Sequence, residues 1–184
     1  MKYVMPIEDR RMVGVIGDYL RERNERDYVL FMTGVYLGRR ISDILQYRVR
    51  DLRGKDRIAI AEQKTGEIIL LPINPHLQKI YRDFFKGKKD YEFAFRNSRS
   101  KQNTPISRIR VWQILNEAAD AVGYKESLSC HTLRKTFAYW LYMDTGGDIV
   151  MVQEVLGHSD PSITRRYIGI DQQKKEKAIN GLHF

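Results

Sequence analysis

The sequence has few of the features that cross-link a chain or anchor it in a membrane. Its 184 residues include one cysteine, Cys130, which excludes an internal disulfide and a four-cysteine zinc site. No apolar run approaches the roughly 20 residues of a membrane span. The start, MKYVMPIEDR, lacks a signal-peptide apolar stretch. Walker-type glycine loops, clustered carboxylates and metal-ligand histidine spacing are also missing. We therefore expect a protein of the reducing cytoplasm.

Acidic residues are in the minority. There are 32 Lys and Arg against 23 Asp and Glu, which gives a net charge of +9. The hydrophobic fraction of 42% and charged fraction of 30% are typical of a folded globular protein. A basic excess favours a polyanionic partner, with nucleic acid first, and the alternative is a basic but inert surface.

Apolar periodicity predicts a mainly helical α+β fold with one small antiparallel sheet after the third helix. The two β-prone runs, RIAIAEQ and EIILLPI, flank Lys64-Thr65-Gly66 and predict a hairpin. No composition shift marks an internal domain boundary. The expected helices begin near Pro6, cover 26–37 and 40–48, follow Asn74-Pro75, and cover 108–121, 131–143, 148–156, 162–167 and part of the charged tail.

Two basic positions lie beside expected breaks in the chain. Arg39 and Arg40 precede a helix for which we expect Ser42 as the cap, and a helix N-terminus with an arginine suits an anion. The alternative is a solvated arginine pair. Lys64 is expected on a tight turn, where a lysine can act as a mobile proton donor or can simply be solvated.

His131 and Arg134 open an otherwise apolar helix, HTLRKTFA. Three positions apart, they share one helix face. Histidine suits proton transfer near neutral pH, and arginine suits a phosphate whose oxygens gain charge. The alternative is an ordinary polar first turn.

The stretch LGHSDPSITRRYIGI contains Tyr167, preceded by Arg165 and Arg166 and, nine positions earlier, by His158. A tyrosine hydroxyl has a pKa near 10 and becomes a nucleophile only with help from a base or from nearby cations. A buried core tyrosine is the usual alternative.

Together and in this order, these residues resemble the catalytic domain of tyrosine recombinases, the phage integrase family. The resemblance extends from about residue 6 to 170. The matching pieces are GRRISD (38–43), Lys64 in KTGEIILLPI, HTLRKTFA (131–138) and LGHSDPSITRRY (156–167).

The resemblance implies that Arg40 and Arg134 grip the non-bridging oxygens of a scissile DNA phosphate, with His158 as a third donor. It implies that no ATP and no metal is needed, because the phosphodiester energy is kept in the link between enzyme and DNA.

It also implies roles for three proton-transferring and nucleophilic residues. Tyr167 would attack phosphorus, His131 would assist its proton transfer, and Lys64 would protonate the departing 5′-oxygen. The product would be a 3′-phosphotyrosine and a free 5′-hydroxyl. The 5′-hydroxyl of a second strand would then attack the phosphotyrosine and reverse the step.

This sequence departs from the family pattern at Arg39, which replaces the usual apolar residue, so that Arg39 and Arg40 compete for one role. We choose Arg40, because Ile41-Ser42-Asp43 sets the register. Asp43 stands where the family often has Glu, and we interpret it as support for local geometry. Further DNA contacts are expected from Arg39, Arg108, Arg110, Gln113, Arg165 and Arg166.

We expect a catalytic domain over residues 1–170 and a tail over 171–184 that docks in a neighbouring protomer of a tetrameric synapse on DNA. An N-terminal DNA-clamping domain, common in the family, is not seen in this sequence. The resemblance implies a bacterial or phage-encoded recombinase. The alternatives are a non-catalytic DNA-binding regulator derived from an integrase and a type IB topoisomerase-like enzyme, with a metallonuclease as a distant fourth.

Overall fold

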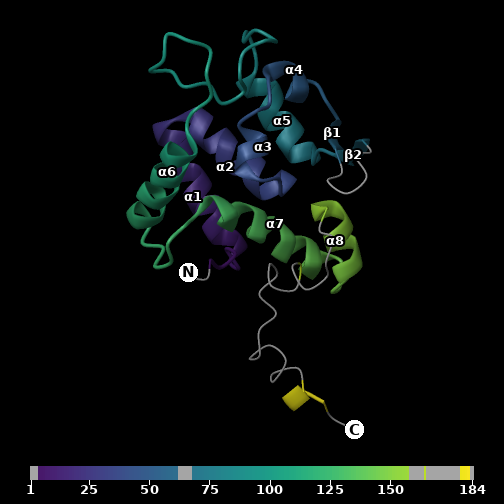
Figure 1. The fold of residues 1–184 in the computed structure, drawn as a ribbon. Helices are drawn as coiled ribbons and strands as arrows, with labels where there is room; N and C mark the ends of the chain where they lie inside the picture. Colours follow the sequence, from purple (N-terminus) through teal and green to yellow (C-terminus); the bar gives the residue numbers. More distant parts are fainter. Residues whose placement is uncertain (1–3, 62–67, 158–163, 165–178, 183–184) are drawn as a thin grey trace.

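The computed structural model describes residues 4–61, 68–157, 164 and 179–182. In this part of the chain helices dominate, and one two-stranded sheet lies at an edge (Figure 1). The helices are α1 (Arg10–Arg23), α2 (Glu25–Leu37), α3 (Ile41–Ile44), α4 (Val49–Leu52), α5 (Pro75–Phe84), α6 (Arg108–Ala121), α7 (Cys130–Asp144) and α8 (Ile149–Leu156). The strands are β1 (Arg57–Ala61) and β2 (Ile68–Pro72).

Helix α2 forms the centre of the core. It packs against α1, α5 and α7, and its apolar residues are buried on every side, as expected for a helix without a polar face. The hydroxyl of Thr33, which is fully buried, donates to the carbonyl oxygen of Val29 at 2.7 Å and lies 2.9 Å from the hydroxyl of Tyr81 on α5. The buried Thr33 hydroxyl of α2 is therefore hydrogen-bonded within the core.

The predicted hairpin is confirmed. Strands β1 and β2 pair antiparallel, from Arg57 opposite Pro72 to Ala61 opposite Ile68. Asn74 then caps α5 by accepting a 2.9 Å hydrogen bond from the backbone N–H of His76. The sheet follows four helices and not three, because the backbone N–H of Arg48 bonds the Asp51 carboxylate at 2.7 Å and closes the one-turn helix α4.

The prediction that the first helix starts near Pro6 is wrong. Helix α1 begins at Arg10, and Asp9 is its N-cap, with its carboxylate accepting from the Arg11 N–H at 2.8 Å. The preceding segment runs along α7 instead. There the N–H of Ile7 donates to Thr136 Oγ1 at 2.9 Å, and its carbonyl oxygen accepts from Trp140 Nε1 at 3.0 Å. These contacts with α7 take the backbone groups that a helix would use.

The expected Ser42 cap is also wrong. Helix α3 begins at Ile41, and the carbonyl oxygen of Arg40 accepts the first helical bonds, from Asp43 at 2.9 Å and Ile44 at 3.0 Å. Ser42 instead donates to the Asp43 carboxylate at 3.3 Å. Arg40 is therefore itself the N-cap residue.

The helices predicted near 108–121, 131–143 and 148–156 are confirmed as α6, α7 and α8. A small apolar cluster of Ala138, Tyr139, Val152 and Leu156 holds α8 against α7. The helix expected over 162–167 and most of the tail lie outside the described residues. No helix in the described ranges has both the length and the apolar character needed to cross a bilayer.

Candidate active site

The N-terminal turn of α7 carries His131 and Arg134. Ser129 caps this helix by accepting from the N–H of His131 at 3.1 Å and of Thr132 at 3.3 Å, and Thr132 Oγ1 accepts from the Ser129 N–H at 2.9 Å. This reciprocal arrangement satisfies N–H groups at the helix start. His131 is exposed, whereas the Arg134 side chain is only 1% exposed. The two residues thus lie on one side of α7 at different depths.

Arg134 joins three helices. Its Nη1 donates to the carbonyl oxygen of Gly38 at 2.7 Å, and its Nη2 donates to the carbonyl oxygen of Leu156 at 2.8 Å. Gly38 ends α2 and Leu156 ends α8, so one guanidinium from α7 connects both helix C-termini. Helix C-termini carry carbonyl groups without intrahelical partners and partial negative charge, which a buried cation compensates.

Two glycines allow α2 to approach α7 closely. Gly38 has φ +59°, and a Cβ there would lie 2.1 Å from Cδ1 of Phe137. A Cβ on Gly34 would lie 2.5 Å from Cδ1 of Leu133. Only glycine fits at these two positions, and the close packing brings the GRRISD segment beside the HTLR segment.

Four cations act on His131. Its pKa is lowered from its ordinary value, first by partial desolvation of the ring and then by the positive charges of Arg108, Arg134, Lys135 and Arg40. These cations come from α6, from α7 and from the start of α3, so distant parts of the sequence meet around one imidazole. The lowered pKa leaves His131 neutral at pH 7, which is the form able to accept a proton.

Arg39 and Arg40 face different surroundings. Arg39 is 9% exposed, its Nε lacks a hydrogen-bond partner, and burial lowers its pKa. Its charge acts on Tyr47, whereas the charge of Arg40 acts on His131. Of the two competing arginines, Arg40 is the one on the side of His131.

Helix α6 brings Arg108 to the same region. The Cys130 thiol lies 3.8 Å from the carbonyl oxygen of Arg108 and donates to it, which links the first turns of α6 and α7. Arg110 instead pairs along its own helix, at 3.0 Å from the Glu117 carboxylate and 3.2 Å from the Gln113 side-chain oxygen. Arg108 therefore adjoins His131, while Arg110 and Gln113 form a separate polar group.

Five other predicted residues, Lys64, His158, Arg165, Arg166 and Tyr167, lie outside the described residues. The described flanks of three of them are informative. Lys64 belongs to the connection between β1 and β2. His158 follows Gly157, two positions after the carbonyl group that Arg134 binds. Thr164, three positions before Tyr167, is fully buried.

Lys135 was not among the site residues predicted from the sequence. It is largely buried, its Nζ donates to the carbonyl oxygen of Val4 at 2.7 Å, and burial lowers its pKa. Its positive charge also lowers the pKa of His131. A lysine directly after Arg134 within an apolar helix was the available signal.

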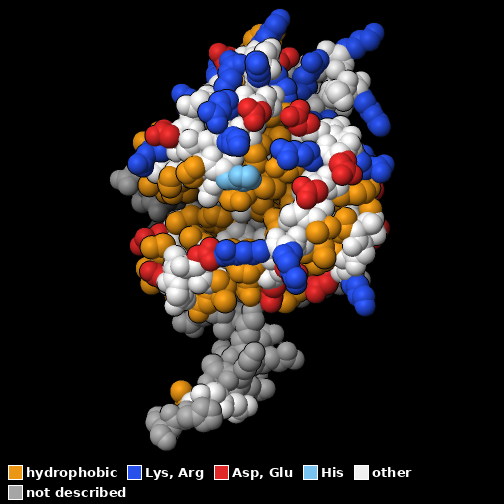
Figure 2. Space-filling view, turned by 180° about the vertical axis from the view of Figure 1, so that it is seen from behind, with side chains coloured by type: hydrophobic (Ala, Val, Ile, Leu, Met, Phe, Trp, Pro, Cys, Tyr) orange, Lys and Arg blue, Asp and Glu red, His pale blue; other side chains and the backbone are white. Residues whose placement is uncertain are grey.

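A second missed feature is a basic surface. Figure 2 shows Lys and Arg side chains gathered at the upper end of the molecule, where Figure 1 places the connection between α5 and α6. That connection contains six lysines and arginines that were not among the residues predicted from the sequence: Lys86, Lys88, Lys89, Arg96, Arg99 and Lys101. A polyanion bound at the site thus has a further basic surface on the same molecule.

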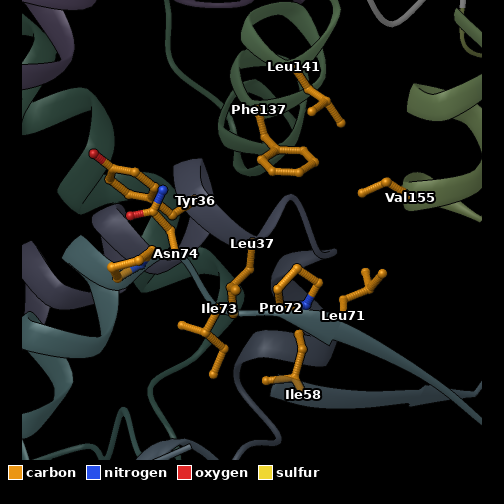
Figure 3. A pocket seen from close by; sticks show the side chains of 11 residues that line it. Tyr36, Leu37, Ile58, Leu71, Pro72, Ile73, Asn74, Phe137, Leu141 and Val155 are labelled. Carbon is orange, nitrogen blue, oxygen red and sulfur yellow. The ribbon is translucent and has the colours of Figure 1, made fainter. Parts of the chain in front are cut away.

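An apolar cavity of about 370 Å³ opens between α2, the β2–α5 connection, α7 and α8. In Figure 3, Phe137, Leu141 and Val155 point toward it from one side, and Leu37, Ile58 and Leu71 border it from the other. Its lining contains no charged side chain, so it differs in character from the cationic surroundings of His131. Among the described residues, no three His, Cys, Asp or Glu side chains gather to hold a metal ion.

Comparison with solved structures defines the class of fold. XerA recombinase matches 98% of this chain and 68% of its own, with a TM-score of 0.75 at 17% identity. XerH site-specific recombinase, solved bound to its difH substrate, matches 98% of this chain and 55% of its own, with a TM-score of 0.69 at 20% identity. The fold is that of tyrosine recombinase catalytic domains.

The family follows from sequence. The family model described as "Phage integrase family" matches residues 12–174, and the chain belongs to this family of site-specific tyrosine recombinases. The probable integrase/recombinase YoeC of Bacillus subtilis (strain 168) is 41% identical over 178 residues, 97% of this chain and 96% of that protein. A tyrosine recombinase of Pseudothermotoga lettingae is 30% identical over 167 residues, 87% of this chain. The chain spans only 55% of the length of that second relative.

Proposed function

We propose that this chain cleaves and rejoins duplex DNA through a covalent 3′-phosphotyrosine formed by Tyr167. The observation that carries the proposal is the convergence of Arg40, Arg134 and His131, which come from two separate motifs of the sequence. A cationic site around a neutral imidazole suits a phosphodiester whose oxygens gain negative charge during attack.

In the first step the Tyr167 oxygen bonds to phosphorus and the bond from phosphorus to the 5′-oxygen breaks. The tyrosine proton passes to His131, which is neutral at pH 7 because its pKa is lowered. Lys64 gives a proton to the departing 5′-oxygen. Arg40, Arg134 and His158 stabilise the charge on the non-bridging oxygens.

In the second step a 5′-hydroxyl of another strand attacks the phosphotyrosine, and the proton transfers run in reverse. The number of phosphoester bonds is unchanged over the two steps, so neither ATP nor a metal ion is required to balance the reaction. This is the chemistry of a strand transferase and not of a hydrolase.

The net charge of the chain and the DNA-bound structures of similar fold both favour duplex DNA as the partner. The net charge is +9, and the related XerH and lambda integrase structures are described as bound to a difH substrate and to a COC′ core site. Phosphate contacts supply most of the affinity of such a surface, and binding is therefore expected to weaken steeply with salt.

Self-association on DNA as a tetrameric synapse is part of this proposal, with the tail 171–184 of one copy docking on another. Ile179 and Leu182, both in the described part of the tail, are exposed apolar residues. The uncharged cavity of Figure 3 offers an apolar surface of matching character. Replacing Leu182 with Asp should reduce tetramers on DNA in analytical ultracentrifugation, and unchanged tetramers would refute tail docking.

The decisive experiment traps the covalent intermediate. A pool of nicked duplexes with randomised core sequences is incubated with the full chain, and the short fragment that carries the new 5′-hydroxyl diffuses away after cleavage, so that the adduct accumulates. We expect a DNA-linked band on denaturing gels with the wild type and none with Tyr167→Phe. Sequencing the trapped DNA also reports the preferred site.

Tyr91→Phe is the matched control, because Tyr91 is an exposed tyrosine on the connection between α5 and α6. It should form the adduct at the wild-type level. An adduct that still forms with Tyr167→Phe would show that Tyr167 is not the nucleophile. DNA binding without any adduct across the whole pool would instead favour a non-catalytic regulator.

A further inference from the structure

Helix α6 presents an apolar pair to solvent beside the cationic site. Ile109 is 71% exposed and Trp112 is 49% exposed, and their spacing of three places them on one helix face. Together with Arg108 and His131 they line a shallow depression of about 370 Å³. A large aromatic and a branched side chain held in water next to charges are uncommon unless they bind something.

This pair is held in place relative to His131. The Asn116 side-chain amide donates to the carbonyl oxygen of Trp112 at 2.8 Å and to that of Leu128 at 2.6 Å. The Cys130 thiol donates to the carbonyl oxygen of Arg108 at 3.8 Å. Helix α6 is therefore attached at both ends of this surface to the segment that begins α7, and the apolar pair keeps a fixed position beside the imidazole.

The positive charge around Ile109 and Trp112 indicates which partner would bind to them. Arg108 adjoins the pair and, with Arg134, Lys135 and Arg40, lowers the pKa of His131. A second copy of this chain carries the same charge of +9 and would be repelled from such a surface, whereas DNA would be attracted. In the major groove of DNA, the apolar group on the base edges is the thymine methyl, which apolar side chains contact.

We propose that Ile109 and Trp112 contact thymine methyl groups in the major groove next to the phosphate that Arg40 and Arg134 bind beside His131. This inference rests on the proposed function, because it uses the same DNA at the same site. It makes α6 a determinant of site preference through apolar contacts, in addition to the arginines expected to contact the DNA. Arg108 then contacts the adjoining backbone.

Trp112 is itself the probe. The chain has two tryptophans, so Trp140→Phe leaves Trp112 as the sole tryptophan. The full-length variant is titrated with two matched 20-base-pair duplexes, one of A·T pairs and one of A·U pairs that lack the methyl groups. We expect the Trp112 emission to change on binding, and the A·T duplex to bind roughly fourfold tighter, the value for burying one methyl group.

Ile109→Ala should reduce the preference for A·T over A·U, and Val15→Ala, an exposed valine on α1, should leave it unchanged. If Trp140→Phe fails to fold, the difference in emission between the wild type and Trp112→Phe gives the same information. Unchanged Trp112 emission at saturating DNA, or equal affinity for the two duplexes, would overturn the inference.

The outcome separates this inference from the proposed function. If the adduct at Tyr167 forms but the Trp112 emission does not change on DNA binding, the strand-transferase function is supported and only the apolar contact is refuted. A Trp112 emission that changes with protein concentration in the absence of DNA would assign the pair to contacts between copies, which also overturns it. A Trp112 response to DNA without trapping would support the contact in a protein that lacks the chemistry.

Discussion

Arg134 donates a 2.7 Å hydrogen bond to the carbonyl oxygen of Gly38, which lies 96 positions earlier in the chain. A second bond, to Leu156, fixes the other side of the same guanidinium. The arginine that the family resemblance assigns to phosphate binding therefore also connects α7 to the C-terminal ends of α2 and α8. Substitutions at this residue should affect stability and chemistry together, and the two effects have to be measured separately.

Arg134→Lys keeps the charge but replaces the planar fork with a single ammonium group, so one buried carbonyl group loses its donor. We expect a loss of about 2 kcal/mol in the free energy of unfolding, the usual cost of one unsatisfied buried group. Urea unfolding followed by circular dichroism measures it. Arg50→Lys, at an exposed arginine, is the control. Equal stability of Arg134→Lys and the wild type would show that the two Arg134 hydrogen bonds do not stabilise the fold.

Gly38→Ala should destabilise by roughly 2–4 kcal/mol, because the residue has φ +59° and the new Cβ would meet the Phe137 ring. Adding Phe137→Ala removes the clash but not the backbone strain. The double variant should then be more stable than the sum of the two single effects, by roughly 1–2 kcal/mol. Strict additivity in a double-mutant cycle would show that the contact between α2 and α7 is not close.

Arg108→Gln should raise the pKa of His131, because it removes one of the positive charges that lower it. If His131 accepts the tyrosine proton, adduct formation falls as pH drops through the pKa of His131. The acidic limb of the rate profile should therefore move to higher pH in this variant. NMR titration of the His131 ring protons gives the pKa directly, and Arg99→Gln, whose charge is not among those acting on His131, should leave it unchanged.

Arg39→Leu should stabilise the fold by about 1 kcal/mol, since it replaces a buried guanidinium whose Nε lacks a hydrogen-bond partner with an apolar side chain. That corresponds to a rise of roughly 2–4 °C in Tm for a chain of this size. Arg40→Leu should abolish adduct formation. The reverse pattern, with Arg39→Leu inactive and Arg40→Leu active, would exchange their roles.

The sequence contained enough local information for most of the elements. Helix α2, the hairpin and the Asn74 cap follow from apolar periodicity and cap chemistry, which are properties of neighbouring residues. The misplaced start of α1 had a different cause. Contacts with Thr136 and Trp140, about 130 positions away, determine where Ile7 lies. No local pattern carries that information.

The site divides in the same way. The ordered motifs predicted His131, Arg134 and Arg40 as members of one site, and in the structure the charges of both arginines act on His131. Their different depths, the burial of Arg39 and the charge of Lys135 next to His131 depend on how α2, α6 and α7 pack. Glycines at 34 and 38 permit that packing, but their sequence context did not reveal which side chains they admit.

The bond from Arg134 to Leu156 has a consequence for the order in which this region assembles during translation. Leu156 leaves the ribosome 22 residues after Arg134, so a nascent polypeptide lacks the second acceptor of the guanidinium until then. A chain that ends before Leu156 would hold this guanidinium through the Gly38 carbonyl group alone.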